Sequence, residues 1–201
     1  MTVLNNNLLL GADASASGYQ ISRSLRFNSA DSSFLSRTPS VASNRRTWTW
    51  AGWVKRSALN SSGGTYQQLF TAGSSGAVRD VFFFDQDTTD TLAFYSIGSG
   101  FGGGVLLFRT NAVFRDVSAW YHIVLAVDTT QATAANRIKL YVNNVQQTFS
   151  TSNYPSQNAD GLINSTTGHA IGRDQGQANQ YFDGYLADIH FIDGQALTPS
   201  S

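Results

Sequence analysis

Apolar and polar residues alternate along most of the chain, which is the spacing of a β-strand with one buried face. In the second half the alternation predicts strands over residues 120–128, 137–143, 169–173 and 181–192. In the first half it predicts strands over residues 19–27, 33–36, 47–56, 66–72, 78–85, 91–97 and 105–110. No long stretch has the 3.6-residue period of an amphipathic helix. We therefore predict a single all-β domain, folded as a two-sheet antiparallel sandwich.

The strand over residues 120–128 is apolar on both of its faces. One face carries Tyr121, Ile123, Leu125 and Val127, and the other carries Trp120, His122, Val124 and Ala126. Such a strand is typical of the middle of a sheet that is covered on both sides. We expect it to be central and buried.

Tryptophans dominate the strand over residues 47–56. Trp48 and Trp50 share one face, and we expect them in the core, where aromatic residues of such runs usually lie. Trp53 falls on the other face unless the strand contains a bulge, for which Gly52 is the natural place. In the last strand, Gly184 predicts either a bulge or the close approach of a neighbouring backbone.

Two loops have informative composition. Asn143 and Asn144 favour the positive φ angles of tight hairpins, so the strand over residues 137–143 should pair with its neighbour. Residues 98–104 hold five glycines around Phe101. Two interpretations of Phe101 stay open, namely an exposed binding tip and an anchored hairpin loop. Residues 148–164 are rich in loop formers.

Composition excludes several classes of function. The chain has 13 basic and 13 acidic residues and a formal net charge of zero, so binding to nucleic acid through phosphate neutralisation is not expected. It has no cysteine, which excludes thiol catalysis, thiolate metal sites and disulfides. All acidic residues are aspartate. The absence of glutamate removes the residue most often tuned as a general acid.

The first twenty residues differ from the rest. They are small and polar except for Leu8, Leu9 and Leu10. We predict an N-terminal arm over residues 1–20, which docks to a partner through these leucines, followed by the sandwich domain over residues 21–201. A frayed terminus is the alternative. The segment lacks the basic and apolar regions of a signal peptide, and no stretch approaches the length of a membrane span, so neither secretion nor membrane insertion is expected.

The order of motifs from Leu25 to Leu197 resembles the laminin-G-like (concanavalin A-like) jelly-roll domains. The resemblance rests on Trp53-Val-Lys55, Trp120-Tyr-His122, Asp128, Leu140-Tyr-Val-Asn143, Ile171-Gly-Arg173, Phe182-Asp-Gly184, Leu186-Ala-Asp188 and Asp193-Gly-Gln-Ala-Leu-Thr198. It implies an all-β jelly roll that binds rather than catalyses.

Residues 19–39 and 45–56 also resemble the version of this domain found in tailed-bacteriophage virion proteins. This resemblance implies a structural virion surface protein, either a capsid decoration protein or a head or tail fibre, made in the host cytoplasm and forming a homo-oligomer with contacts to other virion subunits. The alternative is a lectin-like carbohydrate-binding module of a bacterial surface or secreted protein. The two are compatible, because a virion protein can bind host surface glycans.

Catalysis and metal binding find little support in the residues. Glycoside hydrolases of this fold use paired glutamates, and Asp85 with Asp87 is more simply a solvated turn. The three histidines are far apart and fall within predicted strands. We predict no catalytic residue and no cofactor. Ca²⁺ is the one alternative, because several related domains hold it at the rim of the sandwich through oxygen ligands. Its candidate ligands are Asp85, Asp87, Asp90, Asp128, Asp174 and Asp183.

Binding residues are expected in loops that combine aromatic and amide side chains, because sugars stack on rings and hydrogen-bond through hydroxyls. The candidates for contact with a glycan or a partner are Phe101, Asn153, Tyr154, Asn179, Gln180 and Tyr181.

Overall fold

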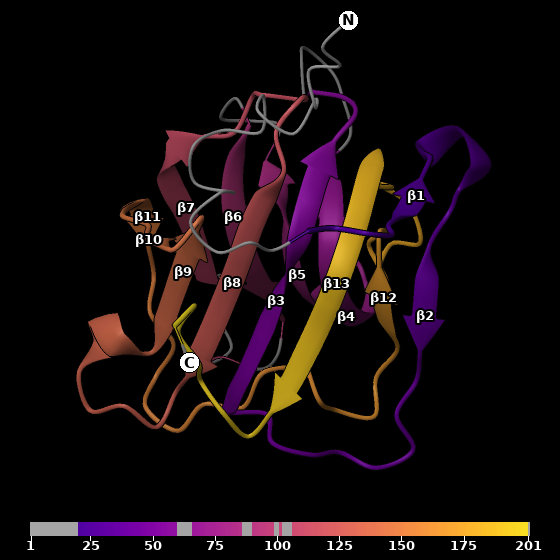
Figure 1. The fold of residues 1–201 in the computed structure, drawn as a ribbon. Coiled ribbons are helices and arrows are strands. Elements are labelled where there is room, and N and C mark those ends of the chain that lie inside the picture. The colour runs from indigo at the N-terminus through magenta and orange to yellow at the C-terminus, as the bar shows by residue number, and fades with distance from the viewer. Residues whose placement is uncertain (1–19, 60–65, 86–89, 99–100, 102–105, 201) are drawn as a thin grey trace, which may run out of the picture.

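The computed structural model describes residues 20–59, 66–85, 90–98, 101 and 106–200. These residues form two antiparallel sheets packed face to face (Figure 1). The six-stranded sheet contains, in spatial order, β1 (Leu25–Phe27), β13 (Gly184–Asp193), β3 (Thr47–Arg56), β8 (Tyr121–Asp128), β9 (Ile138–Val142) and β10 (Val145–Gln146). The seven-stranded sheet contains β11 (Phe149–Ser152), β7 (Leu106–Val113), β6 (Thr91–Ile97), β5 (Val78–Asp85), β4 (Gln67–Ser75), β12 (His169–Ile171) and β2 (Leu35–Arg37). The predicted sandwich is confirmed.

Most predicted strands are present, and the differences have local causes. Strand β1 is shorter than predicted because its pairing with β13 stops at Leu25–Leu186, next to an irregularity of β13 between Ala187 and His190. Strand β11 falls in a region whose sequence predicts a loop, because its residues FSTS contain one apolar side chain. Short 3₁₀ helices occur at Ser29–Asp31 and Ala134–Asn136.

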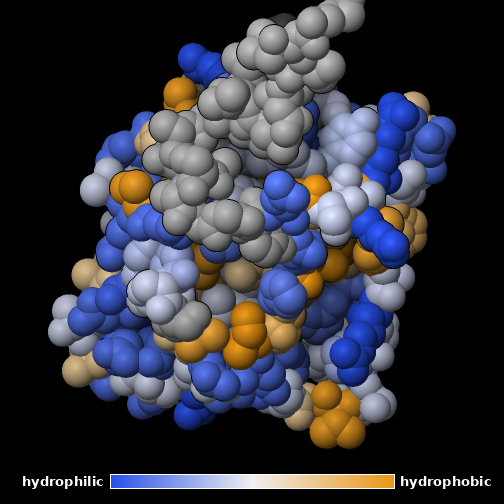
Figure 2. All heavy atoms as spheres, in the orientation of Figure 1, coloured by the Kyte–Doolittle hydropathy of each residue, from blue (hydrophilic) through white to orange (hydrophobic). Residues whose placement is uncertain are grey.

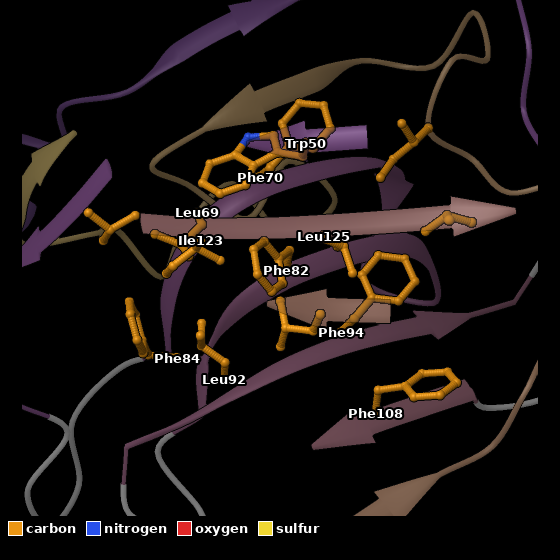
Figure 3. Close-up of a cluster of buried hydrophobic side chains, with 14 of the residues drawn as sticks. Trp50, Leu69, Phe70, Phe82, Phe84, Leu92, Phe94, Phe108, Ile123 and Leu125 are labelled. Carbon is orange, nitrogen blue, oxygen red and sulfur yellow. The ribbon is translucent and has the colours of Figure 1, made fainter. Parts of the chain in front are cut away.

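The core lies between the two sheets and is rich in aromatic rings (Figure 3). Trp48 and Trp50 of β3 are fully buried, and Trp50 packs edge-on against Phe82 of β5 at a centroid distance of 5.5 Å. Strand β8 lies between β3 and β9, and its Tyr121, Ile123, Leu125 and Val127 face this core. Burying a large apolar side chain contributes roughly 1.5–3 kcal/mol. These rings therefore hold the two sheets together, as the sequence predicted.

The bulge predicted at Gly52 lies in the partner strand instead. Strand β3 keeps an unbroken register with β8 from Thr47 to Val54, whereas β13 shifts register opposite Gly52. A Cβ on Gly52 would lie 2.2 Å from Cδ1 of Ile189, so glycine is needed to make room for that side chain. Trp53 consequently keeps the outward direction set by strand parity and lies beside His122, with ring centroids 5.0 Å apart.

Other predictions of local geometry are confirmed. Asn143 and Asn144 have φ angles of 49° and 67° in the β9–β10 hairpin. A Cβ on Gly184 would lie 2.2 Å from the carbonyl oxygen of Lys55, which is the predicted close approach of a neighbouring backbone.

One carboxylate of β5 is directed into the sandwich. Asp80 is fully buried; its Oδ1 accepts a 2.5 Å hydrogen bond from the Ser96 hydroxyl, and its Oδ2 accepts one of 2.6 Å from the Leu162 amide. Burial raises the pKa of Asp80 to about 6, against the opposing effect of these hydrogen bonds. Asp80 thereby ties the segment around Leu162 to the seven-stranded sheet.

The predicted arm over residues 1–20 lies almost wholly outside the described residues, so its boundary at residue 21 stays a prediction. The same holds for Leu8, Leu9 and Leu10. Among the helices of the described part of the chain, none is long and apolar enough to cross a membrane. Figure 2 shows the side of the six-stranded sheet; where grey atoms do not cover it, the surface is mainly hydrophilic, with hydrophobic residues near its middle.

Candidate functional site

The outer face of the seven-stranded sheet, turned away from the viewer in Figure 1, carries an unusual row of side chains along β5. Phe82 and Phe84 point into the main core, so the alternating positions Arg79, Val81, Phe83 and Asp85 point outward. Val81, Phe83 and Ala93 form a second buried apolar cluster on this outer face. A sheet face turned to solvent is normally polar, so this apolar cluster, with Arg79 and Asp85 at the two ends of the same row, marks the outer face as a candidate binding surface.

A groove of about 250 Å³ lies over this patch. It is lined by Tyr66, Gln68, Arg79, Val81, Phe83, Asp85, Tyr95, Leu107, Arg109, Asp174 and Gln180. Its volume is slightly below the roughly 300–1,000 Å³ of typical small-molecule sites. A groove of this size suits a ligand with one small ring, or the terminal unit of a longer ligand.

A second hollow, of about 240 Å³, lies at the β2–β12 edge of the same sheet. Its lining includes Leu35, Phe70 and Phe191 and is mainly apolar. We place the candidate site in the first groove because that groove combines aromatic rings with charged and amide groups, which is the usual make-up of a specific small-molecule site.

Thr71 anchors the segment that forms one wall of the groove. Thr71 points outward from β4, because it is in register with Val81. Its hydroxyl donates to the Arg173 carbonyl over 2.8 Å and accepts from the Gln175 amide over 3.0 Å. These two bonds hold residues 173–175 on the outer face of the sheet.

Asp174 organises the turn that follows. Its Oδ1 accepts hydrogen bonds from the amides of Gly176 and Gln177, over 2.9 and 3.1 Å. Its backbone amide donates to the Asn179 carbonyl over 3.0 Å. The turn closes on the sheet because a Cβ on Gly176 would lie 2.4 Å from the Ser75 carbonyl oxygen. This packing brings Gln180 to Gln68, whose Nε2 donates to Oε1 of Gln180 over 3.0 Å.

Two ion pairs flank the apolar floor. Arg79 Nε lies 3.1 Å from Asp174 Oδ2. Arg109 Nε donates to Asp85 Oδ2 over 2.6 Å. The aspartate side chains are 0% and 1% exposed, whereas those of Arg79 and Arg109 are 15% and 20% exposed. Burial raises the pKa of Asp174, and the nearby Arg79 charge opposes this shift.

Three side chains of the groove carry buried polar atoms without a hydrogen-bond partner. They are Gln68 Oε1, Arg79 Nε and Asp174 Oδ2. The last two attract each other as charges, but the geometry of their 3.1 Å contact is not that of a hydrogen bond. A buried polar group without a partner costs about 1–3 kcal/mol. These three atoms are shielded from solvent, so the groove presents to a ligand the exposed parts of its side chains and not these atoms.

Of the two interpretations of Phe101, the exposed binding tip is wrong. Phe101 is 6% exposed and packs edge-on against Phe94, with ring centroids 5.9 Å apart. It belongs to the main core, as the alternative of an anchored loop implied. The ring fits there because Gly161 has no side chain, which leaves space for it.

The other predicted binding residues fall into two separate groups. Asn153 and Tyr154 follow β11, where the Tyr154 ring packs on Phe108 at 4.9 Å. Asn179, Gln180 and Tyr181 follow the Asp174 turn, and of these Gln180 lines the groove. The Tyr181 ring lies 6.4 Å from that of Phe34. Their roles in binding stay predictions.

The aspartates named as Ca²⁺ ligands are dispersed. Asp85, Asp90 and Asp174 form ion pairs with Arg109, Arg56 and Arg79. Asp128 caps its own turn and Asp183 accepts from the Ser29 amide. Asp87 lies outside the described residues. Within the described ranges, no three histidine or aspartate side chains gather in a way that would hold a metal ion.

The solvated turn predicted for Asp85 is wrong, since this residue is buried and paired.

Sequence reasoning missed most of the groove. It named Gln180 but not Gln68, Arg79, Tyr95 or Arg109 as binding residues. The available signal was strand parity: in VRDVFFFD the face opposite Phe82 and Phe84 holds both apolar and charged side chains. A face of that composition is unexpected for a surface that meets only water.

Comparisons with known proteins agree with this fold. Among solved structures, the CBM40 domain of the Ruminococcus gnavus IT-sialidase bound to α2,3-sialyllactose is 16% identical, with a TM-score of 0.53; the match covers 74% of this chain and 77% of that one. Domains LG4-5 of the mouse laminin α1 chain are 11% identical, with a TM-score of 0.60, over 90% of this chain and 44% of that one.

The NanB sialidase of Streptococcus pneumoniae is 14% identical, with a TM-score of 0.60, over 88% of this chain and 26% of that one. This chain thus spans less than half of the laminin fragment and of the NanB sialidase. Identities this low show a common fold and nothing more. No curated protein sequence matches the chain significantly. The family model described as "Concanavalin A-like lectin/glucanases superfamily" matches residues 28–201, and the chain therefore belongs to that family, in its laminin-G group.

Proposed function

We propose that this chain is a non-catalytic carbohydrate-binding module whose site is the groove on the seven-stranded sheet. The observation that carries the proposal is the combination of aromatic rings with amide and charged side chains in one groove. A sugar ring offers apolar C–H faces together with hydroxyls, and each hydroxyl both donates and accepts hydrogen bonds. The groove offers the complementary set.

The aromatic part of the groove comes from three rings. Tyr66 packs edge-on against Phe83 with centroids 5.3 Å apart, and Tyr95 lies on the neighbouring strand. The Arg79 guanidinium lies 5.7 Å from the centroid of the Tyr95 ring. These contacts fix the rings before any ligand arrives, so little conformational entropy is lost when a ligand stacks on them.

The acidic groups of the groove do not suit glycoside hydrolysis. That reaction uses two carboxyl groups about 5–9.5 Å apart, one of them protonated. Here each carboxylate is committed to an arginine. One ion pair includes Arg79 and the other includes Asp85. These two residues are six positions, or roughly 20 Å, apart along β5. The chain also contains no glutamate.

The similar folds lend the proposal support. One of them, the CBM40 domain, is bound to sialyllactose. The likeness concerns the backbone fold, so it is the groove residues of this chain that support carbohydrate binding.

The setting in which the module works is a second proposal, carried by the phage-like sequence of residues 19–39 and 45–56. In that setting the chain is a virion surface protein, a capsid decoration or fibre component, that assembles as a homo-oligomer with other virion subunits. Gold labelling of purified particles with an antibody against this chain is the test. Particles without label, prepared from cells that make the protein, would exclude this setting and leave glycan binding in place.

Glycan binding is tested by screening the full chain on a glycan array and measuring the hits by isothermal titration calorimetry. We expect at least one glycan family to bind, and Tyr95→Ala to weaken it strongly. The matched control is Tyr185→Ala, because Tyr185 is also half-buried but belongs to the six-stranded sheet. Equal loss in both variants, or hits that bind the Tyr95→Ala variant unchanged, would refute the groove as the site.

A further inference from the structure

We infer that the groove selects uncharged saccharides and rejects acidic ones, because both of its arginines are already neutralised by buried aspartates. This inference rests on the proposed glycan-binding function and adds the chemical class of the ligand.

The charges that line the groove cancel one another. The described lining residues include Arg79 and Arg109 as cations and Asp85 and Asp174 as anions. Each arginine faces one aspartate: Arg79 lies 3.1 Å from Asp174, and Arg109 donates to Asp85 over 2.6 Å. The groove therefore offers no excess positive charge to an incoming anion.

The two aspartate side chains are also fixed in position. Asp174 is held by two backbone amides at its Oδ1, and its side chain is 0% exposed. Asp85 is the last residue of β5, and its side chain is 1% exposed. An acidic sugar would have to compete with carboxylates that are fixed and shielded from water, where like charges repel strongly.

Recognition of acidic sugars usually relies on an arginine whose planar fork is free to bind a carboxylate with two hydrogen bonds. In this groove the Nε of Arg109 is already used for Asp85. The uncharged groups that the groove offers a ligand are the amides of Gln68 and Gln180 and the rings of Tyr66, Phe83 and Tyr95. These groups match hydroxyls and C–H faces.

The test uses matched pairs of probes that differ in charge, namely lactose against 3′-sialyllactose and neutral against uronic-acid oligosaccharides of the same length. The neutral panel also includes glucose, mannose and arabinose oligomers. Binding to the wild-type chain is measured by calorimetry at low and high salt, about 0.05 and 0.5 M, because salt screens charge–charge attraction. We expect neutral probes to bind, with affinities that change less than about twofold with salt.

The charge balance is then altered by substitution. Asp174→Asn frees Arg79, and we expect it to raise the affinity for the acidic member of a pair by roughly tenfold at low salt. The matched control is Asp160→Asn, because Asp160 pairs with Arg46 at the exposed surface, away from the groove. If Asp174→Asn does not fold, as judged by thermal unfolding, the salt dependence of the wild-type chain still decides the question.

Three outcomes are distinguishable. Preference for the neutral probes supports the inference. Binding of acidic probes that is clearly tighter and falls with salt overturns the inference but leaves the proposed function standing. A folded chain that binds no probe of either panel overturns both.

Discussion

Gln68 of β4 donates a 3.0 Å hydrogen bond to Gln180, which lies 112 residues later in the chain. The contact closes one wall of the groove and leaves Gln68 Oε1 buried without a partner. Gln180 is half-buried and lies on the turn organised by Asp174. One side chain therefore links the position of the turn to the wall of the groove.

Replacing Gln68 by leucine keeps its approximate size and removes both amide functions. We expect Gln68→Leu to lower glycan affinity by roughly 2–10-fold, which corresponds to one hydrogen bond of about 0.5–1.5 kcal/mol. Thermal stability should change little, since the half-buried Gln180 remains accessible to water. Calorimetric titration measures the affinity. Gln146→Leu, at an exposed position of β10, is the control that should bind like the wild type.

Thr71 holds the groove wall without being one of its lining residues. Thr71→Val has nearly the same shape but loses both hydrogen bonds to residues 173–175. We expect a free energy of unfolding lower by about 1–3 kcal/mol and a weaker affinity, measured by urea denaturation and calorimetry. Thr38→Val, at an exposed position, should change neither quantity. Wild-type affinity in a Thr71→Val variant would show that residues 173–175 do not shape the site.

Asp80 makes stability depend on pH. Its pKa is raised to about 6 in the folded state from 3.8, so the folded chain binds a proton more tightly than the unfolded chain. Its contribution to the free energy of unfolding should therefore rise as pH falls from about 6 to 4, by about 3 kcal/mol in total. Above pH 6 the contribution should be constant.

The comparison of wild type with Asp80→Asn isolates this effect, because burial also lowers the pKa of His122 and of His169, which acts in the opposite direction on acidification. Urea denaturation at several pH values between 4 and 7 is the measurement. Parallel curves for the two proteins would show that Asp80 titrates normally in the folded state.

Gly52 and Ile189 should be energetically coupled across the β3–β13 pair. A Cβ at position 52 would lie 2.2 Å from Cδ1 of Ile189, so Gly52→Ala should cost about 1–3 kcal/mol of stability. Ile189→Ala removes the obstructing atoms. We expect the double variant to be more stable than the sum of the single effects predicts. Strict additivity in chemical denaturation would contradict the steric explanation.

The sequence predicted the fold well where strand alternation is strong. The bounds of β3, β5 and β6 agree with the predicted ranges because each is a run rich in aromatic and β-branched residues. The short strands β10 and β11 were not predicted. They carry few apolar residues and are held mainly by backbone hydrogen bonds to their neighbours, which leave no pattern in the side chains.

The groove could be predicted only in part. Parity places Arg79 and Asp85 on the same face of β5, but it does not say which strands lie beside them. Arg109 and Asp174 reach that face through sheet order and through the turn held by Thr71. Such long-range pairings depend on the whole fold. Phe101 illustrates the opposite error, in which a glycine-rich context suggested exposure for a residue that the core accommodates.

The most direct test of the account is an NMR titration of the isotopically labelled chain with the tightest-binding glycan of the array. We predict that the largest amide shift changes cluster at Gln68, at Val81 and Phe83, and in the turn from Asp174 to Gln180. Changes confined to the six-stranded sheet or to the hollow around Leu35 and Phe191, with the β5 amides unaffected, would contradict the groove as the carbohydrate-binding site.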